Sequence, residues 1–363
     1  MPPKQKRGAK PKQDWRTNIN LFSEVDPVKK EELQDIQRRV ERCREAQWQD
    51  QILVVKEGIQ SFFGFEAKDD QARCIAHLLF KQRDLILTAK TSFGKSLIHQ
   101  ALPCLSRGSV AIVIVPLDAL GKEQEKKISL IPGTRPIFLN ASNTNDGVIQ
   151  EVQKGAYTHI ITSPEQLIGK RFRILIQDRL FRSHLLSVCI DELHLVFDWG
   201  DKFRHSYTEL RIVRRELEDI PWFGTTATLD RLTLSHVRGL LELSDHIQVI
   251  QTDTNREDLT YIAKQIPIHT QKSFLGLNFL LEGAFRHCVN REQDLPGGCC
   301  DACHCQGKGF IPTPEQIDKT IIFFKAKREI RECTKIIRSW FQEYGYSEIL
   351  AKDTVAQYGT MLT

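Results

Sequence analysis

The chain has 363 residues, which is enough for two domains of ordinary size. With 41% hydrophobic and 27% charged residues, its composition excludes a chain that is disordered throughout. The longest aliphatic run, Val110 to Val115, is far shorter than the ~18 residues that span a bilayer, and no apolar stretch follows the N-terminal charges. We therefore expect no membrane partner, no secretory signal and a reducing compartment for the ten cysteines.

The net charge of +5 is carried by the N-terminal tail. Residues 1–16 hold a single acid, Asp14, and the basic residues Lys4, Lys6, Arg7, Lys10, Lys12 and Arg16. We interpret residues 1–25 as a disordered basic tail. Charge without a fold suits nuclear import, which predicts a nuclear protein, or loose binding of phosphates. A solvated end without a ligand is equally compatible with the pattern.

Residues 26–60 are predicted to be a helical segment. Asp26 and Pro27 are typical of an N-cap and a first helical position, and apolar residues between Leu33 and Val40 recur at helical spacing. This pattern predicts a helix over 27–48 that docks through one apolar stripe.

From residue 70 onward, short β-branched runs alternate with segments long enough for crossover helices. This alternation predicts a domain over 61–252 with an α/β fold, in which a parallel sheet is covered by helices on both faces and binds ligands at the carboxyl ends of its strands. The predicted strands are 84–88, 110–115, 137–140, 159–162, 185–190, 222–225 and 247–251.

The rhythm weakens after residue 252. A Gly-, Pro- and Cys-containing stretch covers 271–318, and a strand over Thr320–Phe324 and a helix over 327–341 follow it. We interpret 253–363 as the beginning of a second domain that carries 271–318 as an insertion.

A phosphate-binding loop is predicted between the strand that ends at Thr88 and the helical residues after Ser96. Its sequence follows the Walker A pattern, with alanine in place of the first glycine, over Ala89, Lys90, Thr91, Ser92, Phe93, Gly94, Lys95 and Ser96. Backbone N–H groups and the positive end of the following helix would hold the oxygens of a polyphosphate. Lys95 would contact the β- and γ-phosphates, and the Ser96 hydroxyl would bind Mg²⁺. The alternative is an ordinary glycine turn that opens a helix.

Acidic residues follow another apolar run, 185–190. Asp191 at this position would hold hydrated Mg²⁺, and Glu192 would orient or deprotonate the attacking water. Taken alone, such a pair is also compatible with a solvated strand end.

With both motifs in place, the sequence resembles the superfamily 2 helicases of the DExH type, most closely the RecQ-like DNA helicases, over roughly 60–262. Asp191 to His194 resembles the DExH box, with Leu193 where the family usually has alanine. The resemblance implies a RecA-like P-loop NTPase fold with a partial second RecA-like domain, ATP and Mg²⁺ as cofactors, and His194 as a further catalytic residue.

The resemblance also implies roles for residues outside the two motifs. Phe62 to Gln71 resembles the segment whose glutamine recognises adenine. Segments 114–120, followed by Gln124, and 161–167 resemble motifs Ia and Ib, which line the DNA path in the family. The implied nucleic-acid contacts there are Pro116, Leu117, Ser163 and Pro164.

Two further segments match motifs of the family. Gly224 to Thr228 is similar to motif III, which implies that Thr226 and Thr228 link hydrolysis to strand movement. Asn255 to Leu259 resembles the hinge between the two helicase halves, although Glu257 and Asp258 replace the usual proline and asparagine.

An aromatic segment, 197–204, follows the DExH box and resembles the DNA-sensing loop of RecQ-like proteins. Trp199 and Phe203 offer faces on which bases can stack, and Arg204 offers charge to the backbone. The alternative is that these aromatic side chains pack the loop onto the sheet. The Asp201-Lys202 pair departs from the family's usual His-Asp.

The second helicase half is incomplete in this sequence. Residues 320–341 resemble motif IV, but no Gln-x-x-Gly-Arg-x-x-Arg segment follows. We therefore expect ATP binding with weak turnover, and little unwinding by this chain alone. Where the family resemblance holds, the direction is 3′ to 5′.

Cysteines crowd into residues 288–305. Cys300 and Cys303 have the spacing of zinc ligands. The sequence has no second cysteine pair at the standard spacing of a zinc site. The alternative to a zinc site is therefore a flexible insertion with free thiols.

Two functions fit the whole pattern. One is an ATP-dependent DNA helicase-like motor domain that binds single-stranded or partly duplex DNA, with RNA and the oligomeric state left open. The other is a degenerate ATP-binding adaptor for nucleic acids. A small-molecule kinase is a third option, but it gives no reason for the aromatic segment after the acids.

Overall fold

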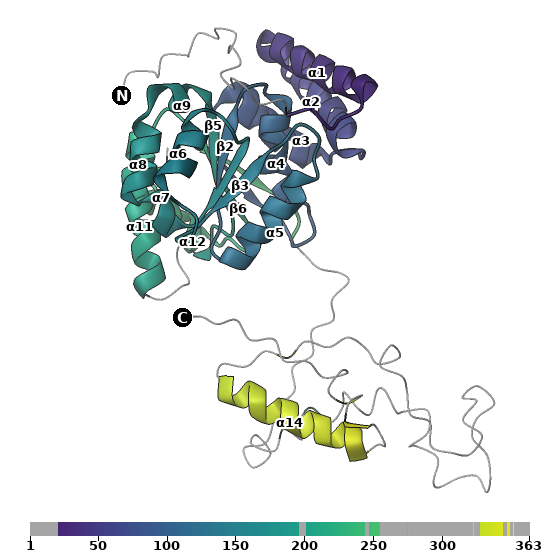
Figure 1. Ribbon diagram of the computed structural model, residues 1–363, viewed down its shortest axis with the longest axis vertical. Coiled ribbons are helices and arrows are strands. Elements are labelled where there is room, and N and C mark those ends of the chain that lie inside the picture. The colour runs from purple at the N-terminus through teal and green to yellow at the C-terminus, as the bar shows by residue number, and fades with distance from the viewer. Residues whose placement is uncertain are drawn as a thin grey trace, which may run out of the picture. The chain divides into compact units, whose positions relative to one another are not determined.

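The computed structural model describes residues 21–195, 201–243, 247–254 and 327–343, together with Phe274, Leu277, Ile322, Ser347, Glu348 and Ala351 (Figure 1). For 201–208 it describes the backbone alone. The chain divides into two compact units, residues 1–258 and 259–363.

The first unit begins with a pair of helices where the sequence predicted one. Helix α1, Pro27–Arg42, is followed by a 3₁₀ turn, Cys43–Glu45, and then by α2, Trp48–Phe63. The predicted helix over 27–48 is therefore too long. The chain turns because Gln51 of α2 donates side-chain hydrogen bonds to the carbonyls of Cys43 and Arg44, at 3.1 and 2.9 Å, where α1 ends.

Seven parallel strands form one sheet, which confirms the predicted parallel sheet, and their order is β3-β4-β2-β5-β6-β1-β7. Each strand coincides with a predicted run to within two residues at either end. The strands are β1 Leu85–Thr88, β2 Val110–Ile114, β3 Pro136–Leu139, β4 His159–Thr162, β5 Leu185–Ile190, β6 Trp222–Thr226 and β7 Gln248–Gln251.

Helices lie on both faces of the sheet (Figure 1), and each face has its own hydrophobic core. Leu85 and Leu87 of β1 pack into one core, whereas Ile86 between them packs into the other. The first core also takes side chains from α1, α2, α3 (Asp69–Ala76), α4 (Ser96–Leu105) and α5 (Asp118–Ser129). The second takes them from α6 (Asp146–Gln153), α7 (Pro164–Leu167), α8 (Lys170–Gln177), α9 (Arg179–His184), α11 (Asp201–Glu216) and α12 (Arg231–Leu240). The predicted α/β class is confirmed.

A buried ion pair lies at the amino ends of β1 and β6. Arg214 of α11 donates to Asp84 at 2.5 Å, and the second carboxylate oxygen of Asp84 accepts the backbone N–H of Trp222 at 2.9 Å. The Arg214 and Asp84 side chains are 7% and 10% exposed. The pair thus fixes α11 to the sheet end opposite the strands' carboxyl ends.

In the second unit, α14 spans Lys327–Glu343, which confirms the predicted helix over 327–341. Cys333, Ile337 and Phe341 of this helix form a small buried cluster with Ala351. Across the described ranges of both units, no helix is both long and apolar enough to cross a membrane.

Candidate functional site

The predicted phosphate loop connects the end of β1 to the start of α4. Ser92 and Gly94 adopt positive φ angles of 69° and 87°. A side chain at position 94 would also collide with Gln71, because an added Cβ would lie 2.6 Å from the Gln71 Nε2 atom. Both the backbone angle and the space require glycine there.

The loop presents hydrogen-bond donors at the amino end of α4. Within the described part of the chain, the backbone N–H groups of Gly94, Lys95 and Ser96 have no hydrogen-bond partner. They lie where the helix dipole is positive, an arrangement suited to phosphate oxygens. The Lys95 ammonium donates to the carbonyls of Ala89 and Lys90, at 3.0 and 3.4 Å.

Gln71 of α3 is bonded to this loop through both ends of its amide. Its Nε2 donates to the carbonyls of Phe93 and Gly94 at 2.9 and 3.2 Å, and its Oε1 accepts the Lys68 backbone N–H at 2.9 Å. Adenine recognition by Gln71 stays a prediction. Lys68, which the sequence analysis did not single out, also contacts the loop. Its ammonium donates to the Phe93 carbonyl at 3.1 Å and lies 4.8 Å from the centre of the Phe93 ring.

The predicted acids follow β5. One Asp191 oxygen accepts hydrogen bonds from the Thr225 hydroxyl at 2.7 Å and from the Glu192 backbone N–H at 3.1 Å. Glu192 has a positive φ of 52°. Burial, and next the Asp191 carboxylate, raise the pKa of Glu192, while the His194 and Lys95 charges act in the opposite direction. Because β1 and β5 both pair in parallel with β6, the phosphate-loop lysine and the strand-end acids lie at the same edge of the sheet.

His194 connects these acids to the end of β6. Its Nδ1 lies 3.0 Å from the Thr226 hydroxyl oxygen and 3.3 Å from a Glu192 carboxylate oxygen. The Thr226 hydroxyl gives its own proton to the Thr228 carbonyl at 2.9 Å. Nδ1 of His194 must therefore be the protonated nitrogen, which donates toward both oxygens.

Leu193, the departure from the family's alanine, fits because of a glycine on the neighbouring strand. Leu193 is 1% exposed, and an added Cβ on Gly224 would lie 2.5 Å from its Cδ2 atom. The two residues are complementary in shape, so the DExH box packs directly on the β6 backbone.

The predicted nucleic-acid residues Pro116 and Ser163 follow β2 and β4, at the same carboxyl edge of the sheet as the loop and acids. Leu117 is the N-cap of α5. The Ser163 hydroxyl caps α7 by accepting the Gln166 N–H at 3.4 Å, and Pro164 takes the first position of that helix.

Several predicted residues lie beyond what the structure describes. Trp199, the hinge 255–259 and the zinc candidates Cys300 and Cys303 are outside the described residues. Phe203 and Arg204 lie in α11 with the backbone alone described. Their roles stay predictions.

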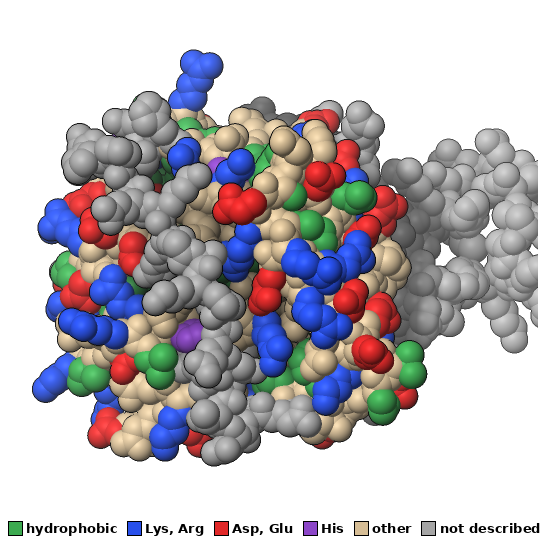
Figure 2. All heavy atoms as spheres, turned by 90° about the horizontal axis from the view of Figure 1, so that it is seen from above, with side chains coloured by type: hydrophobic (Ala, Val, Ile, Leu, Met, Phe, Trp, Pro, Cys, Tyr) green, Lys and Arg blue, Asp and Glu red, His purple; other side chains and the backbone are tan. Residues whose placement is uncertain are grey.

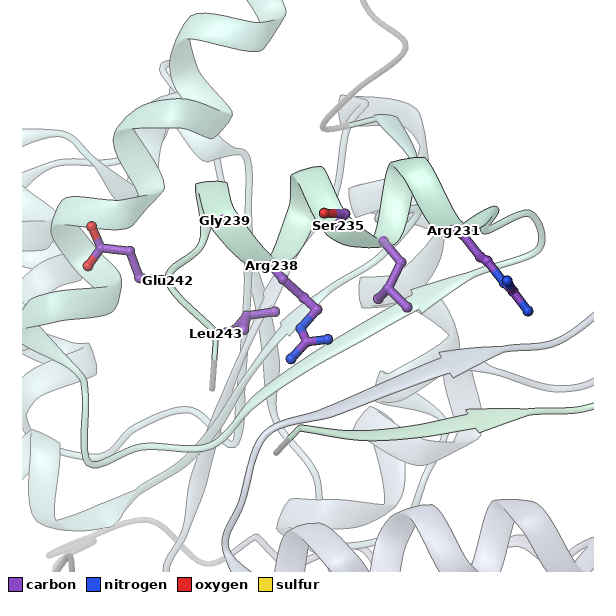
Figure 3. Close-up of a pocket in the computed structure, with 7 residues that line it drawn as sticks. Arg231, Ser235, Arg238, Gly239, Glu242 and Leu243 are labelled. Carbon is purple, nitrogen blue, oxygen red and sulfur yellow. The ribbon is translucent and has the colours of Figure 1, made fainter. Parts of the chain in front are cut away.

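A separate shallow pocket of about 670 Å³ runs along α12, where Arg231, Arg238 and Glu242 contribute to its lining (Figure 3). It shares no residue with the phosphate loop or the acids. This pocket is therefore not the candidate site, which we identify by its hydrogen-bond donors and carboxylates.

The donor set at the sheet edge fits a magnesium nucleotide. The Ser96 hydroxyl and the Asp191 carboxylate offer the oxygen ligands that Mg²⁺ prefers, and the loop N–H groups offer the donors that phosphates require. Magnesium in such sites keeps several water ligands, so few protein ligands are needed.

Comparison with known proteins shows which family this part of the chain resembles. Residues 68–236 match the family model of the DEAD/DEAH box helicases. The chain is 30% identical over 223 residues to a putative ATP-dependent DNA helicase Q1 of Caenorhabditis briggsae, covering 59% of this chain and 35% of the relative. It is 29% identical over 190 residues to the ATP-dependent DNA helicase RecQ of Haemophilus influenzae, covering 52% and 30%.

A solved structure, the DUF1998 helicase MrfA bound to DNA, matches with a TM-score of 0.45 and 19% identity, covering 55% of this chain and 29% of that one. The chain spans about a third of the length of the curated relatives that it matches. Residues 68–236 are therefore similar to the DEAD/DEAH box helicase domain, and the curated relatives that the chain matches are RecQ-family ATP-dependent DNA helicases.

Proposed function

We propose that this chain is an ATP-dependent DNA helicase-like motor domain that binds ATP–Mg²⁺ and hydrolyses it in response to single-stranded DNA. One observation carries the proposal: the loop that holds Lys95 follows β1, Glu192 follows β5, and both strands pair in parallel with β6. The two residues, 97 positions apart in numbering, therefore lie at one edge of the sheet. That is the pairing that phosphoryl transfer to water requires.

Bound ATP–Mg²⁺ would supply the phosphoanhydride bond and the metal charge that stabilises the departing phosphate. The N–H groups of Gly94, Lys95 and Ser96 would hold the phosphate oxygens. For Lys95 to join them, its ammonium exchanges the carbonyls of Ala89 and Lys90 for phosphate oxygens. Ser96 and Asp191 would hold the metal, and Thr225 keeps Asp191 oriented by donating to it.

Glu192 would take a proton from the attacking water. A raised pKa makes its carboxylate a better proton acceptor near neutral pH. His194 contacts both Glu192 and Thr226, and Thr226 donates to the Thr228 carbonyl. A change in the charge or position of Glu192 would therefore be transmitted to the end of β6, which is the coupling role proposed for Thr226 and Thr228.

For DNA binding we propose local contacts and not a broad charged surface. Figure 2 shows basic and acidic side chains interspersed on the face that it presents, and the net charge of the chain lies in its tail. We propose contacts by Pro116, Leu117, Ser163 and Pro164 at the sheet edge, with stacking on the aromatic segment 197–204. The proposal also covers direction, efficiency and location. We propose that the motor moves from 3′ to 5′, that this chain alone unwinds DNA weakly, and that the protein is nuclear.

A nucleotide-binding adaptor without motor activity is the second candidate. The Asp201-Lys202 pair favours it, since it departs from the family's usual His-Asp in the segment that would couple DNA sensing to hydrolysis.

A titration of ATPase activity against single-stranded DNA, duplex DNA and RNA separates the two candidates. We expect single-stranded DNA to raise the hydrolysis rate of the full chain several-fold and Lys95→Ala to abolish that hydrolysis. Hydrolysis that stays at the level of Lys95→Ala with every nucleic acid, while DNA binding persists, would favour the adaptor.

A further inference from the structure

Gln124 of α5 is hydrogen-bonded to the proposed magnesium ligand. Its Nε2 donates to the Ser96 hydroxyl oxygen at 3.2 Å, and its Oε1 accepts from Gln100 Nε2 at 3.1 Å. Ser96 and Gln100 are four residues apart on α4, so they share one face of that helix. Gln124 is 9% exposed. A single buried amide therefore bridges the first turn of α4 from a neighbouring helix.

The backbone of Gln100 is fixed to the sheet. The Gln100 carbonyl lies 3.1 Å from His159 Nε2, and because a carbonyl can only accept, Nε2 is the donor. His159 Nδ1 is then the acceptor for the Thr158 hydroxyl at 2.9 Å. These bonds join the backbone of α4 to β4, and the Gln124 amide is itself held at both ends by its bonds to Ser96 and Gln100.

The bond from Gln124 sets the direction of the Ser96 hydroxyl. A serine oxygen has one proton and two lone pairs, and the amide N–H occupies one of the lone pairs. The hydroxyl proton then cannot point at Gln124, so the proton and the second lone pair are confined to the two remaining staggered positions. Without this donor, the hydroxyl would rotate among its three staggered positions.

We propose that Gln124 is a positioning residue that holds the Ser96 hydroxyl in the orientation required to bind the Mg²⁺ of ATP–Mg²⁺. This inference rests on the proposed nucleotide site. It gives Gln124 a role in metal-dependent nucleotide binding and none in binding the nucleotide without metal.

Two variants separate this role from general support of α4. Gln124→Met removes the donor and keeps the length of the side chain. Gln37→Met is the matched control, because Gln37 is 6% exposed and donates to the Cys104 carbonyl at 2.7 Å, at the other end of α4. Each variant loses one hydrogen bond from a buried glutamine side chain to α4. Thermal unfolding shows whether each variant is folded.

The measurement is the affinity of the full chain for a fluorescent ATP analogue, first in EDTA and then along a Mg²⁺ titration. In Gln124→Met we expect the Mg²⁺ concentration at half-maximal tightening to rise about two- to tenfold, the range of one net hydrogen bond, with unchanged affinity in EDTA. In Gln37→Met both quantities should match the wild type. An unchanged midpoint in Gln124→Met, or an equal shift in Gln37→Met, would overturn the inference.

Gln100→Met gives a second test should Gln124→Met fail to fold. This variant removes the N–H donor to the Gln124 Oε1 atom but keeps the bond from Gln124 to Ser96. The Mg²⁺ midpoint should therefore shift in the same direction by a smaller factor. An unchanged midpoint would contradict the role. A wild-type chain that binds no analogue in either buffer would overturn the proposed nucleotide site as well. A wild-type chain that binds normally beside unshifted variants would overturn the role of Gln124 alone.

Discussion

Glu192→Gln is expected to lower the rate of ATP hydrolysis by about 10²- to 10⁴-fold, the usual contribution of a general base, while ATP–Mg²⁺ binding changes by less than a few-fold. The amide keeps the shape of the side chain but cannot take a proton from water. Steady-state hydrolysis and nucleotide binding, measured on the same preparation, give the two numbers.

Glu31→Gln is the matched control, since Glu31 is an exposed glutamate on α1 and belongs to none of the proposed sites. It should hydrolyse ATP at the wild-type rate. The pH profile adds a second check: because burial and Asp191 raise the pKa of Glu192, activity should fall on the acid side at a higher pH than an ordinary glutamate would give. A Glu192→Gln variant that retains more than a tenth of the rate would exclude Glu192 as the base.

Gly224→Ala is expected to lower both stability and hydrolysis. The new methyl group would lie 2.5 Å from Cδ2 and 3.3 Å from Cδ1 and Cγ of Leu193, whose side chain is buried. Overpacking of this kind costs about 1–3 kcal/mol of unfolding free energy. Moving Leu193 also moves its neighbours Glu192 and His194, and a misplacement of about 1 Å can reduce a rate on the order of a hundredfold.

Leu193→Ala in the same chain should rescue Gly224→Ala. Alone, Leu193→Ala leaves a cavity that costs about 2–5 kcal/mol. In the double variant the alanine methyl at 224 partly fills that cavity, so the loss of unfolding free energy should be smaller than the sum of the single losses. Urea unfolding and hydrolysis rates of all four chains test this. Strictly additive losses would show that Leu193 and Gly224 do not pack as described.

The sheet was predictable because buried parallel strands are continuous apolar runs in sequence. Val110–Ile114 and Leu185–Ile190 are buried throughout, and both runs are visible without a structure. The break between α1 and α2 was not predictable from the sequence, because residues 43–47 contain neither glycine nor proline. The turn there depends on Gln51, whose side chain reaches back to the end of the preceding helix.

The candidate site was predictable where chemistry follows a local motif, as at Lys95 and Glu192. The contacts that orient those motifs come from tertiary packing. Gln124 and Ser96 are separated by 28 positions, and no local pattern relates them. Leu193 was visible only as a departure from a family pattern, and its explanation lies in Gly224 on another strand.

Binding of ATP–Mg²⁺ to the full chain, measured by titration calorimetry beside Lys95→Ala, tests the central claim most directly. We predict one nucleotide per wild-type chain, binding that weakens when Mg²⁺ is removed, and at least tenfold weaker binding in Lys95→Ala at unchanged thermal stability. The absence of any binding by a folded wild-type chain, or equal binding by Lys95→Ala, would contradict the claim that the loop and the acids form a nucleotide site.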